Sequence, residues 1–153
     1  MRVFPTPGDL RGAVGEHLGY SDWSLITQDQ VTAFADATGD HQWIHVDTER
    51  AATGPYGTTI AHGYLVLSLL PVLCAGVFRV DGAALAVNYG LNRVRFPAPV
   101  PTGSEVRAGV RVAGVEEVAG GIAATCEVAV EVRGASKPSC VAETVTRWYL
   151  PTP

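Results

Sequence analysis

The sequence predicts an α+β fold, in which a curved antiparallel sheet wraps around a long central helix. Helical patterns occupy the first half of the chain, and period-two patterns fill the second half from Ala84 onward. Between them, residues 60–78 read IAHGYLVLSLLPVLCAGVF, which is apolar nearly all round. Such a helix needs other structure around it, and strands with one apolar face can supply it. At 153 residues, the chain is expected to form one domain, 1–153.

The first helix is expected to begin near Thr27 and to end at Gly39. Thr27 and Gln30 have the spacing of a capping box, which satisfies backbone N–H groups at a helix start. Glycine adopts the left-handed conformation that commonly ends helices. A short helical turn should follow at residues 47–52, with Asp47 as its cap. The loop TGPYGTT then connects this turn to the central helix.

The central helix contains Pro71, which is expected to kink it or to divide it into two pieces. Its apolar run, YLVLSLLPVLCAGVF, is too short to span a bilayer. The N-terminal residues MRVFPTPGDLRGAVGEHLG lack the continuous apolar stretch of a signal peptide. We therefore expect no membrane association.

The sheet is expected to form from four segments with period-two patterns: residues 85–96, 104–115, 121–132 and 140–150. In the third segment, alternate positions from Ile122 to Val132 are apolar and share one face. The second segment shows the same alternation, with charged side chains on its opposite face. Turn-rich links join the segments, so an antiparallel meander is expected.

The amino-acid composition of the chain indicates which classes of binding partner to expect. The net charge of −4, without a cluster of basic residues, argues against nucleic-acid binding. Hydrophobic residues make up 47% of the chain and charged residues 17%, so we expect a second copy to cover apolar surface in a homodimer. Three scattered cysteines, Cys74, Cys126 and Cys140, indicate reduced thiols in a cytoplasmic protein. A small molecule is the expected ligand.

The segment TGDHQWIHVD, residues 38–47, concentrates polar groups in an apolar chain. Its alternation predicts an extended segment, with His45 on one side and its aliphatic neighbours on the other. A carboxylate only accepts hydrogen bonds, whereas a neutral histidine donates at one nitrogen and accepts at the other. Held on either side of a water, Asp40 and His45 could remove a proton and direct the oxygen at a carbon. The residue types fit equally well a simpler interpretation, in which Asp40 caps a turn and His45 is a core histidine.

Gly63 adds a third element at the expected start of the central helix. Backbone N–H groups there have no acceptor inside the helix, and the helix dipole favours an oxygen that gains negative charge. Glycine also lets a ligand approach the backbone. Taken alone, Gly63 is better explained by close packing. Together with Asp40 and His45, it completes the set needed to add water beside a thioester carbonyl.

The stretch FADATGDHQWIHVDTERAATGPYGTTIAHGYLVLSLL resembles the hydratase motif of the MaoC-like dehydratases, the (R)-specific enoyl-CoA hydratases of the hot-dog fold. The match covers Asp40, His45, Asp47, the AHG of residues 61–63 and Ser68. The later stretch YGLNRVRFPAPVPTGSEV resembles the family's strand that follows the helix. The resemblance implies a five-stranded sheet around a long helix, and a homodimer with joined sheets. It also implies that Asp40 and His45 are the catalytic dyad and that the Gly63 N–H holds the thioester oxygen.

The chain departs from the family pattern between the two catalytic positions. The family usually has Asn-Pro where this chain has Gln42-Trp43, a form that resembles the nodulation-protein-N-like subgroup. Gln42 also carries an amide, which can position the dyad or the substrate. Trp43 is expected to pack beneath the loop in preference to lining an acyl pocket.

Five side chains are candidate metal ligands: Asp40, His41, His45, Asp47 and His62. The segment lacks the apolar period of a helix that would bring His41 and His45 together, and the family needs no metal. We expect neither metal nor cofactor, because the thioester itself acidifies C2. Arg93 and Arg95, on one face of a strand, could equally contact the phosphates of coenzyme A or lie on a solvated face.

The expected function is an (R)-specific enoyl-CoA hydratase of fatty-acyl metabolism. It would reversibly add water to a trans-2-enoyl thioester of coenzyme A or acyl carrier protein, giving the (3R)-3-hydroxyacyl thioester. Two alternatives remain. A hot-dog thioesterase would direct water to the carbonyl carbon, and a non-catalytic acyl-thioester-binding or partner subunit would need no acid–base pair. The Asp-x4-His spacing followed by AHG favours the hydratase.

Overall fold

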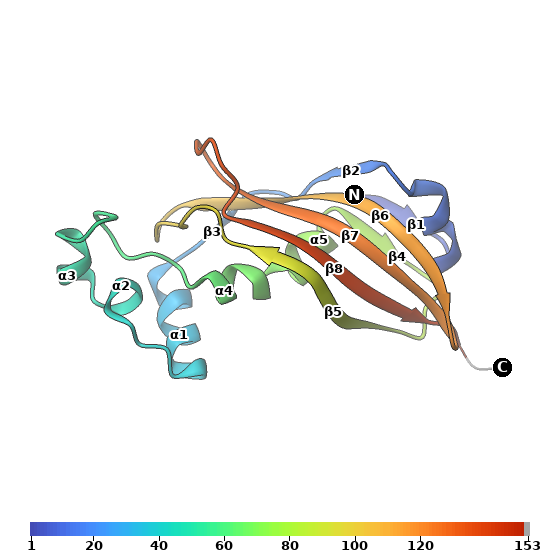
Figure 1. The fold of residues 1–153 in the computed structure, drawn as a ribbon, viewed down its shortest axis with the longest axis horizontal. Coiled ribbons are helices and arrows are strands. Elements are labelled where there is room, and N and C mark those ends of the chain that lie inside the picture. Colours follow the sequence, from blue (N-terminus) through green and yellow to red (C-terminus); the bar gives the residue numbers. More distant parts are fainter. Residues whose placement is uncertain (152–153) are drawn as a thin grey trace.

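The main sheet is built from the second half of the chain. In the computed structural model, which describes residues 1–151, the long strands are β5 (Leu85–Arg95), β6 (Glu105–Val118), β7 (Gly121–Val132) and β8 (Cys140–Tyr149). Two short strands, β2 (His17–Tyr20) and β3 (Ser24–Leu25), pair with β6. The order is β2-β6-β7-β8-β5, neighbours run antiparallel, and the sheet is curved (Figure 1). The four predicted strands are confirmed. Positions 152 and 153 of the expected domain lie outside the described residues.

Only three of these strands form the predicted meander. Strands β6, β7 and β8 follow one another as neighbours, whereas β5 lies at the far edge and pairs with β8. The link of residues 96–104 between β5 and β6 is too long for a tight hairpin and contains three prolines. This link runs alongside the residues that precede the central helices, and there the Ala61 N–H donates to the Val100 C=O at 2.8 Å. The prediction of a four-stranded meander is therefore wrong for β5.

The central helical segment lies under the curved sheet as two short helices (Figure 1). They are α4 (Gly63–Ser68) and α5 (Leu70–Ala75), which replace the predicted helix over residues 60–78. The predicted division near Pro71 is confirmed. Pro71 occupies the first turn of α5, where its missing N–H removes no helical hydrogen bond. No helix within residues 1–151 is long and apolar enough to cross a membrane.

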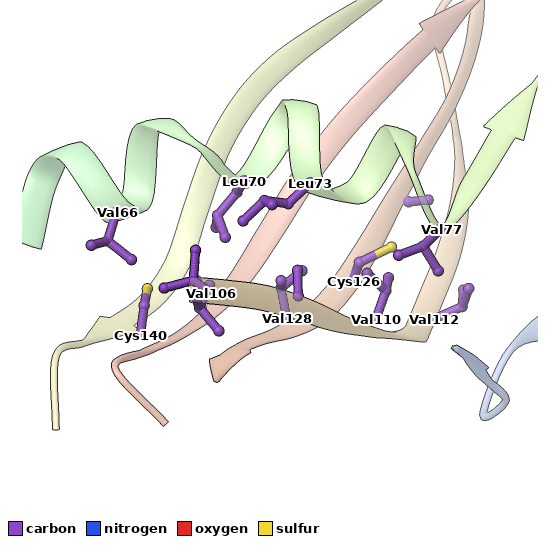
Figure 2. Close-up of a cluster of buried hydrophobic side chains, with 14 of the residues drawn as sticks. Val66, Leu70, Leu73, Val77, Val106, Val110, Val112, Cys126, Val128 and Cys140 are labelled. Carbon is purple, nitrogen blue, oxygen red and sulfur yellow. The ribbon is translucent and has the colours of Figure 1, made fainter. Parts of the chain in front are cut away.

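The hydrophobic core forms between these helices and the inward face of the sheet. The predicted alternation is confirmed, since every second side chain is buried along most of β6 and β7. Figure 2 shows Leu70 and Leu73 directed toward the valines of both strands. The same buried cluster includes Phe4 near the N-terminus and Trp148 on β8.

Three helices lie together at one end of the sheet, beside α4 (Figure 1). They are α1 (Gln28–Thr38), α2 (Trp43–Val46) and α3 (Thr48–Ala52). The predicted caps are confirmed at Thr27, Gly39 and Asp47, although within residues 1–151 the Gln30 side chain does not complete the capping box. The Thr27 side chain accepts from the Gln30 N–H at 3.2 Å, and Gly39 ends α1 with a φ of 81°. Asp47 caps α3 by accepting from the Arg50 N–H at 3.0 Å.

The N-terminal residues form elements that the sequence patterns did not predict. Strand β1 (Arg2–Phe4) pairs in parallel with β4 (Phe78–Val80), and the 3-10 helix η1 (Pro7–Ala13) follows β1. In Figure 1 these elements lie at the end of the sheet opposite to α1, α2 and α3. Because β4 begins at Phe78, the central helical segment ends earlier than predicted.

Candidate active site

Residues 43–46 form the one-turn helix α2, which corrects the prediction of an extended segment. The Asp47 N–H donates to the Trp43 C=O at 3.0 Å and closes the turn. One turn is too short to show the apolar period that reveals longer helices. The turn buries His45 to 7% exposure, whereas the Asp40 side chain keeps 55% of its surface exposed. The predicted pair thus combines a buried imidazole with a solvent-accessible carboxyl group.

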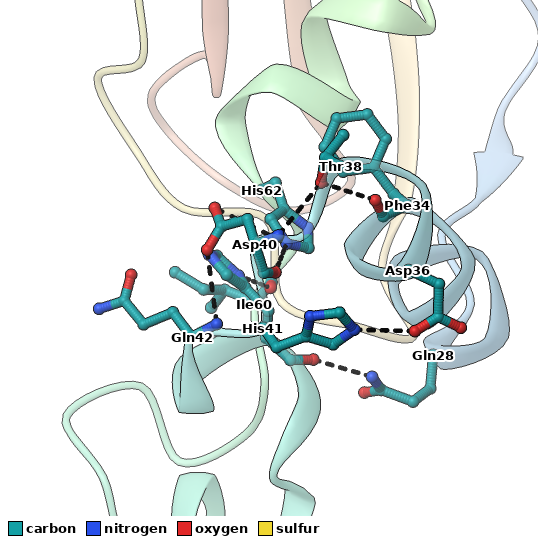
Figure 3. Close-up of polar contacts among 10 residues, drawn as sticks. Gln28, Phe34, Asp36, Thr38, Asp40, His41, Gln42, Ile60 and His62 are labelled. Atoms are coloured by element: carbon teal, nitrogen blue, oxygen red, sulfur yellow. Dashed lines mark hydrogen bonds and ion pairs between the residues drawn. The ribbon is translucent and has the colours of Figure 1, made fainter.

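Two contacts fix the orientation of His45. Its Nδ1 lies 2.7 Å from the Ile60 C=O, and because a carbonyl oxygen only accepts, Nδ1 carries the proton. In the neutral imidazole, Nε2 therefore keeps its lone pair and can act as a base. The Gln28 side-chain amide donates to the His45 C=O at 2.8 Å (Figure 3). Because Gln28 begins α1 and Ile60 precedes α4, two separate elements hold the histidine.

His62 connects Asp40 and His45. Its Nε2 donates to the Asp40 C=O at 2.9 Å and lies 4.0 Å from the carboxylate Oδ2 (Figure 3). The His62 and His45 rings stack, with centroids 3.8 Å apart and an interplanar angle of 24°. One polar atom from each of the three residues lies within 4.8 Å of the other two. From the sequence, His62 was only a candidate metal ligand, although it belongs to the same AHG stretch as Gly63.

Gln42 contacts Asp40 through its backbone. The Gln42 N–H donates to Asp40 Oδ1 at 3.4 Å. The Gln42 side chain is exposed and extends away from His62 (Figure 3), where a ligand arriving from solvent can reach the amide. Trp43 packs against α3, in agreement with the favoured interpretation, and the Arg50 guanidinium lies 4.3 Å from the centre of its ring.

Gly63 is the first residue of α4 and directly follows His62. Backbone N–H groups in the first turn have no acceptor inside the helix. A Cβ at this position would lie 3.0 Å from the ring of Phe96, so a side chain here would force that ring to move. The packing and the oxyanion interpretations are compatible, because the missing side chain accommodates Phe96 and leaves the N–H available.

A cavity of about 700 Å³ lies between the central helices and the open edge of the sheet. Its walls include Ser68 and Cys74 from the helices, Asn88 and Leu91 from β5, and Trp148 from β8. Neither Asp40 nor His45 lines it, and within α4 its lining includes Leu67 and Ser68, at the end of the helix opposite to Gly63. Burial raises the pKa of the Cys74 thiol to about 12, with a further contribution from Cys126, so this wall is uncharged at neutral pH.

The candidate metal ligands are only partly brought together. His41 pairs with Asp36 at 2.8 Å (Figure 3), and Asp47 caps α3. His45 Nδ1 and His62 Nε2 each donate to a backbone carbonyl, and the two rings present their faces to each other. A ring nitrogen binds a metal in the plane of its ring, so stacked rings are poorly arranged to share one ion. The donor set does not fit a resident metal.

Arg93 and Arg95 share one face of β5, as expected, since their partners on β8 are Glu143 and Val141, two residues apart. Both arginines are exposed. The register places the carboxylate of Glu143 opposite Arg93, which favours the solvated-face interpretation over a phosphate site.

Comparison with known proteins identifies the family. The family model of the MaoC like domain matches residues 9–133. The 3-hydroxyacyl-thioester dehydratase Z of Mycobacterium tuberculosis is 58% identical over 149 residues, which cover 97% of this chain and 99% of that protein. Nodulation protein N of Rhizobium leguminosarum is 42% identical over 141 residues, 90% of this chain and 88% of that protein. The solved (R)-hydratase from A. caviae has a TM-score of 0.71 at 27% identity, covering 90% of this chain and 96% of that one. The chain belongs to the MaoC-like dehydratase family and has its hot-dog fold.

Proposed function

We propose that the protein is an (R)-specific hydro-lyase that interconverts trans-2-enoyl and (3R)-3-hydroxyacyl thioesters. The observation that carries the proposal is the Asp40–His45 pair, in which an accessible carboxylate oxygen and a ring nitrogen lie within 4.8 Å of each other. The pair occurs in a chain that is 58% identical to a protein named 3-hydroxyacyl-thioester dehydratase. A protein that only bound thioesters would not need such an acid–base pair.

Asp40 and His45 would hold one water between them. In the hydration direction, the pair takes a proton from this water while its oxygen forms a bond to C3. The electrons of the C2=C3 double bond move toward C2, which receives a proton. His45 Nε2 offers the lone pair that a base needs, because Nδ1 donates to the Ile60 C=O. The Asp40 side chain is 55% exposed, which supports its access to water and substrate.

The Gly63 N–H would hold the thioester oxygen. Negative charge grows on that oxygen as C3 is attacked, and a donor fixed in place lowers the barrier. Helix α4 runs from Gly63 to Ser68, and Ser68 lines the cavity. A thioester bound at Gly63 could therefore direct its acyl chain along α4 into that cavity. The reaction needs neither metal nor cofactor, because the thioester carbonyl acidifies C2.

The test is turnover of a short trans-2-enoyl-CoA, followed by loss of its absorbance, with free thiol measured in parallel. Asp40→Asn and His45→Ala should each lower turnover by at least about 10²-fold, since general acid–base assistance contributes about 10²–10⁴-fold. Residues that act on one water work as a unit, so the double variant should lose far less than the product of the single losses. Gln42→Ala should lose about tenfold or less if its amide only positions the substrate.

Circular dichroism would establish that each variant is folded. Release of thiol without hydration would identify a thioesterase instead. Near-normal turnover in both single variants would contradict the dyad assignment and return Asp40 to the role of a turn residue.

We further propose that the protein is a homodimer joined through the edge of β5. Within residues 1–151 this strand pairs only with β8, and its exposed side chains include Leu85, Val87, Tyr89 and Leu91. An open strand edge with large apolar side chains is a ready surface for pairing with a second copy. The dimer would also close the side of the cavity formed by β5.

Sedimentation velocity at micromolar concentration tests the dimer. Val87→Glu places a charge on the proposed interface and should shift the protein toward the monomer. Val14→Glu is a matched control, because Val14 is similarly exposed but lies outside the sheet. A wild-type monomer at this concentration would contradict the proposal.

Two further expectations belong to the same proposal. The protein acts as one domain over residues 1–153, a reading supported by a buried cluster that extends from Phe4 to Trp148. It works in the cytoplasm, where reducing conditions suit its three free cysteines.

A further inference from the structure

His62 is buried with one of its two ring nitrogens unpartnered. Only 3% of the residue is exposed. Its Nε2 donates to the Asp40 C=O, but Nδ1 has no hydrogen-bond partner among residues 1–151. A buried polar atom without a partner lowers stability, and an apolar side chain of similar shape would avoid that loss. Packing alone therefore does not explain a histidine at this position.

The side-chain hydrogen bond of His62 and its closest ring contact are both to the dyad. The hydrogen bond to the Asp40 C=O, at 2.9 Å, is shorter than the other bonds of that residue. The Asp40 N–H reaches the Thr38 hydroxyl at 3.4 Å, and Asp40 Oδ1 accepts from the Gln42 N–H at the same distance. Because Asp40 lies in an exposed link between α1 and α2, the bond from His62 is its firmest attachment to the buried part of the site.

The second contact restrains the ring of His45. The hydrogen bond from Nδ1 to the Ile60 C=O fixes one edge of that ring but still allows the ring to tilt about the bond. The stacked His62 ring, 3.8 Å away between centroids, blocks this tilt. Phe34 packs against His62 in turn, with centroids 5.0 Å apart, and limits movement of the His62 ring itself.

We propose that His62 is a positioning residue of the dyad, which fixes the backbone of Asp40 by a hydrogen bond and the ring plane of His45 by stacking. The inference rests on the catalytic roles proposed above for Asp40 and His45. His62 holds the two groups in one geometry and does not itself touch the reacting atoms. Histidine combines a ring and a hydrogen-bond donor in one side chain. Its second nitrogen, Nδ1, is left unpartnered and lowers the stability of the fold.

Three substitutions separate the two contacts. His62→Phe keeps the stacked ring and removes the donor together with the unpartnered nitrogen. His62→Gln keeps an amide donor and removes the ring, and His62→Leu removes both. Leu73→Val is the control for core packing, because Leu73 is buried in α5 and belongs to no part of the proposed site.

The decisive comparison is between turnover and thermal stability. His62→Phe should have a Tm equal to or above that of the wild type, with kcat lowered by about 10- to 100-fold through misplacement of the dyad. KM should change by less than about threefold, because His62 does not contact substrate. His62→Leu should lose more turnover than either variant that retains one contact. Leu73→Val should lower Tm and leave kcat unchanged.

Three results would overturn the inference. A His62→Phe enzyme with kcat within about threefold of wild type would show that the hydrogen bond positions nothing. Turnover that follows Tm across all four variants would indicate a purely structural residue. A raised KM at unchanged kcat would place His62 in contact with substrate.

A second measurement separates this inference from the proposed function. The NMR resonances of the His45 ring are displaced by the stacked His62 ring. They should move in His62→Leu and stay close to wild type in His62→Phe. This readout needs no activity, so it tests the stacking even if the wild-type protein hydrates no enoyl thioester. Unchanged His45 resonances in His62→Leu would refute the positioning role.

Discussion

The side chain of Gln28 links three parts of the site, and its removal should affect both stability and turnover. Its Nε2 donates to the His45 C=O at 2.8 Å, and its Oε1 accepts from the Thr59 hydroxyl. The substitution Gln28→Leu roughly keeps the volume of the side chain and removes these two hydrogen bonds, together with a longer one from Nε2 to the Thr32 hydroxyl at 3.3 Å. Thr59 retains its contact with Thr102, so the main unpartnered group left behind is the His45 C=O.

The expected magnitude follows from these two bonds. A partly buried hydrogen bond contributes about 0.5–1.5 kcal/mol, so Gln28→Leu should lower the free energy of unfolding by about 1–3 kcal/mol. In a domain of this size, each kcal/mol shifts Tm by about 2–4 °C, which gives a loss of about 2–12 °C. The carbonyl and the ring of His45 move together, so turnover should also fall, by about tenfold or more.

Thermal unfolding by circular dichroism and kcat measured well below Tm provide the assay. Gln30→Leu is the matched control, because Gln30 lies on the same helix and its side chain makes no hydrogen bond within residues 1–151. The control should change neither quantity. If Gln28→Leu unfolds and turns over like the control, the link between α1 and His45 contributes nothing and the reasoning is wrong.

Three further results are expected. Activity should survive exhaustive chelation, and restoration of lost activity by zinc would instead make the histidines a ligand set. Cys74, whose pKa burial raises to about 12, should resist alkylation by iodoacetamide at neutral pH until the protein unfolds, as mass spectrometry would detect. The hydrogen bond to Asp36 raises the pKa of His41 above 6.5, so its stabilising contribution is full below that pH and is lost as the pH rises through the folded-state pKa. The Tm difference between wild type and His41→Ala should therefore be larger at about pH 5.5 than at about pH 8.5, and an equal or reversed difference would contradict it.

The elements predicted correctly are those whose sequence signals come from residues close together in the chain. The caps at Thr27, Gly39 and Asp47 depend on residues within one turn, and each lies where the sequence indicates. The inward faces of β6 and β7 follow directly from alternation, over residues 106–112 of β6 and 122–132 of β7. The position of β5 in the sheet does not follow from alternation. The long link of residues 96–104 frees β5 from pairing with β6, and β5 instead occupies the edge of the sheet beside β8. No pattern within β5 itself encodes its pairing with β8.

The candidate active site likewise combines residues that are close in the sequence with residues that are distant in it. Asp40 and His45 were predicted because their spacing lies within one short segment and resembles a known motif. The Ile60 carbonyl, the Gln28 amide and the ring of His62 reach them from residues 15 to 22 positions away. Their contacts exist only after α1 and the chain before α4 have packed against α2. The short spacing and the resemblance therefore indicated the candidate reacting groups and missed the groups that contact them.

Proton transfer and acyl binding, the two tasks of the proposed enzyme, involve different parts of the fold. The dyad lies on the link and turn between capped helices, where hydrogen bonds from α1 and from the chain before α4 restrict movement. The cavity lies beyond the other end of α4, with walls from the helices and from the exposed edge strand β5. Substitutions in the cavity can therefore change which acyl groups fit without moving Asp40 or His45. Because β5 forms both a cavity wall and the proposed dimer edge, the second subunit would influence acyl binding more directly than it influences proton transfer.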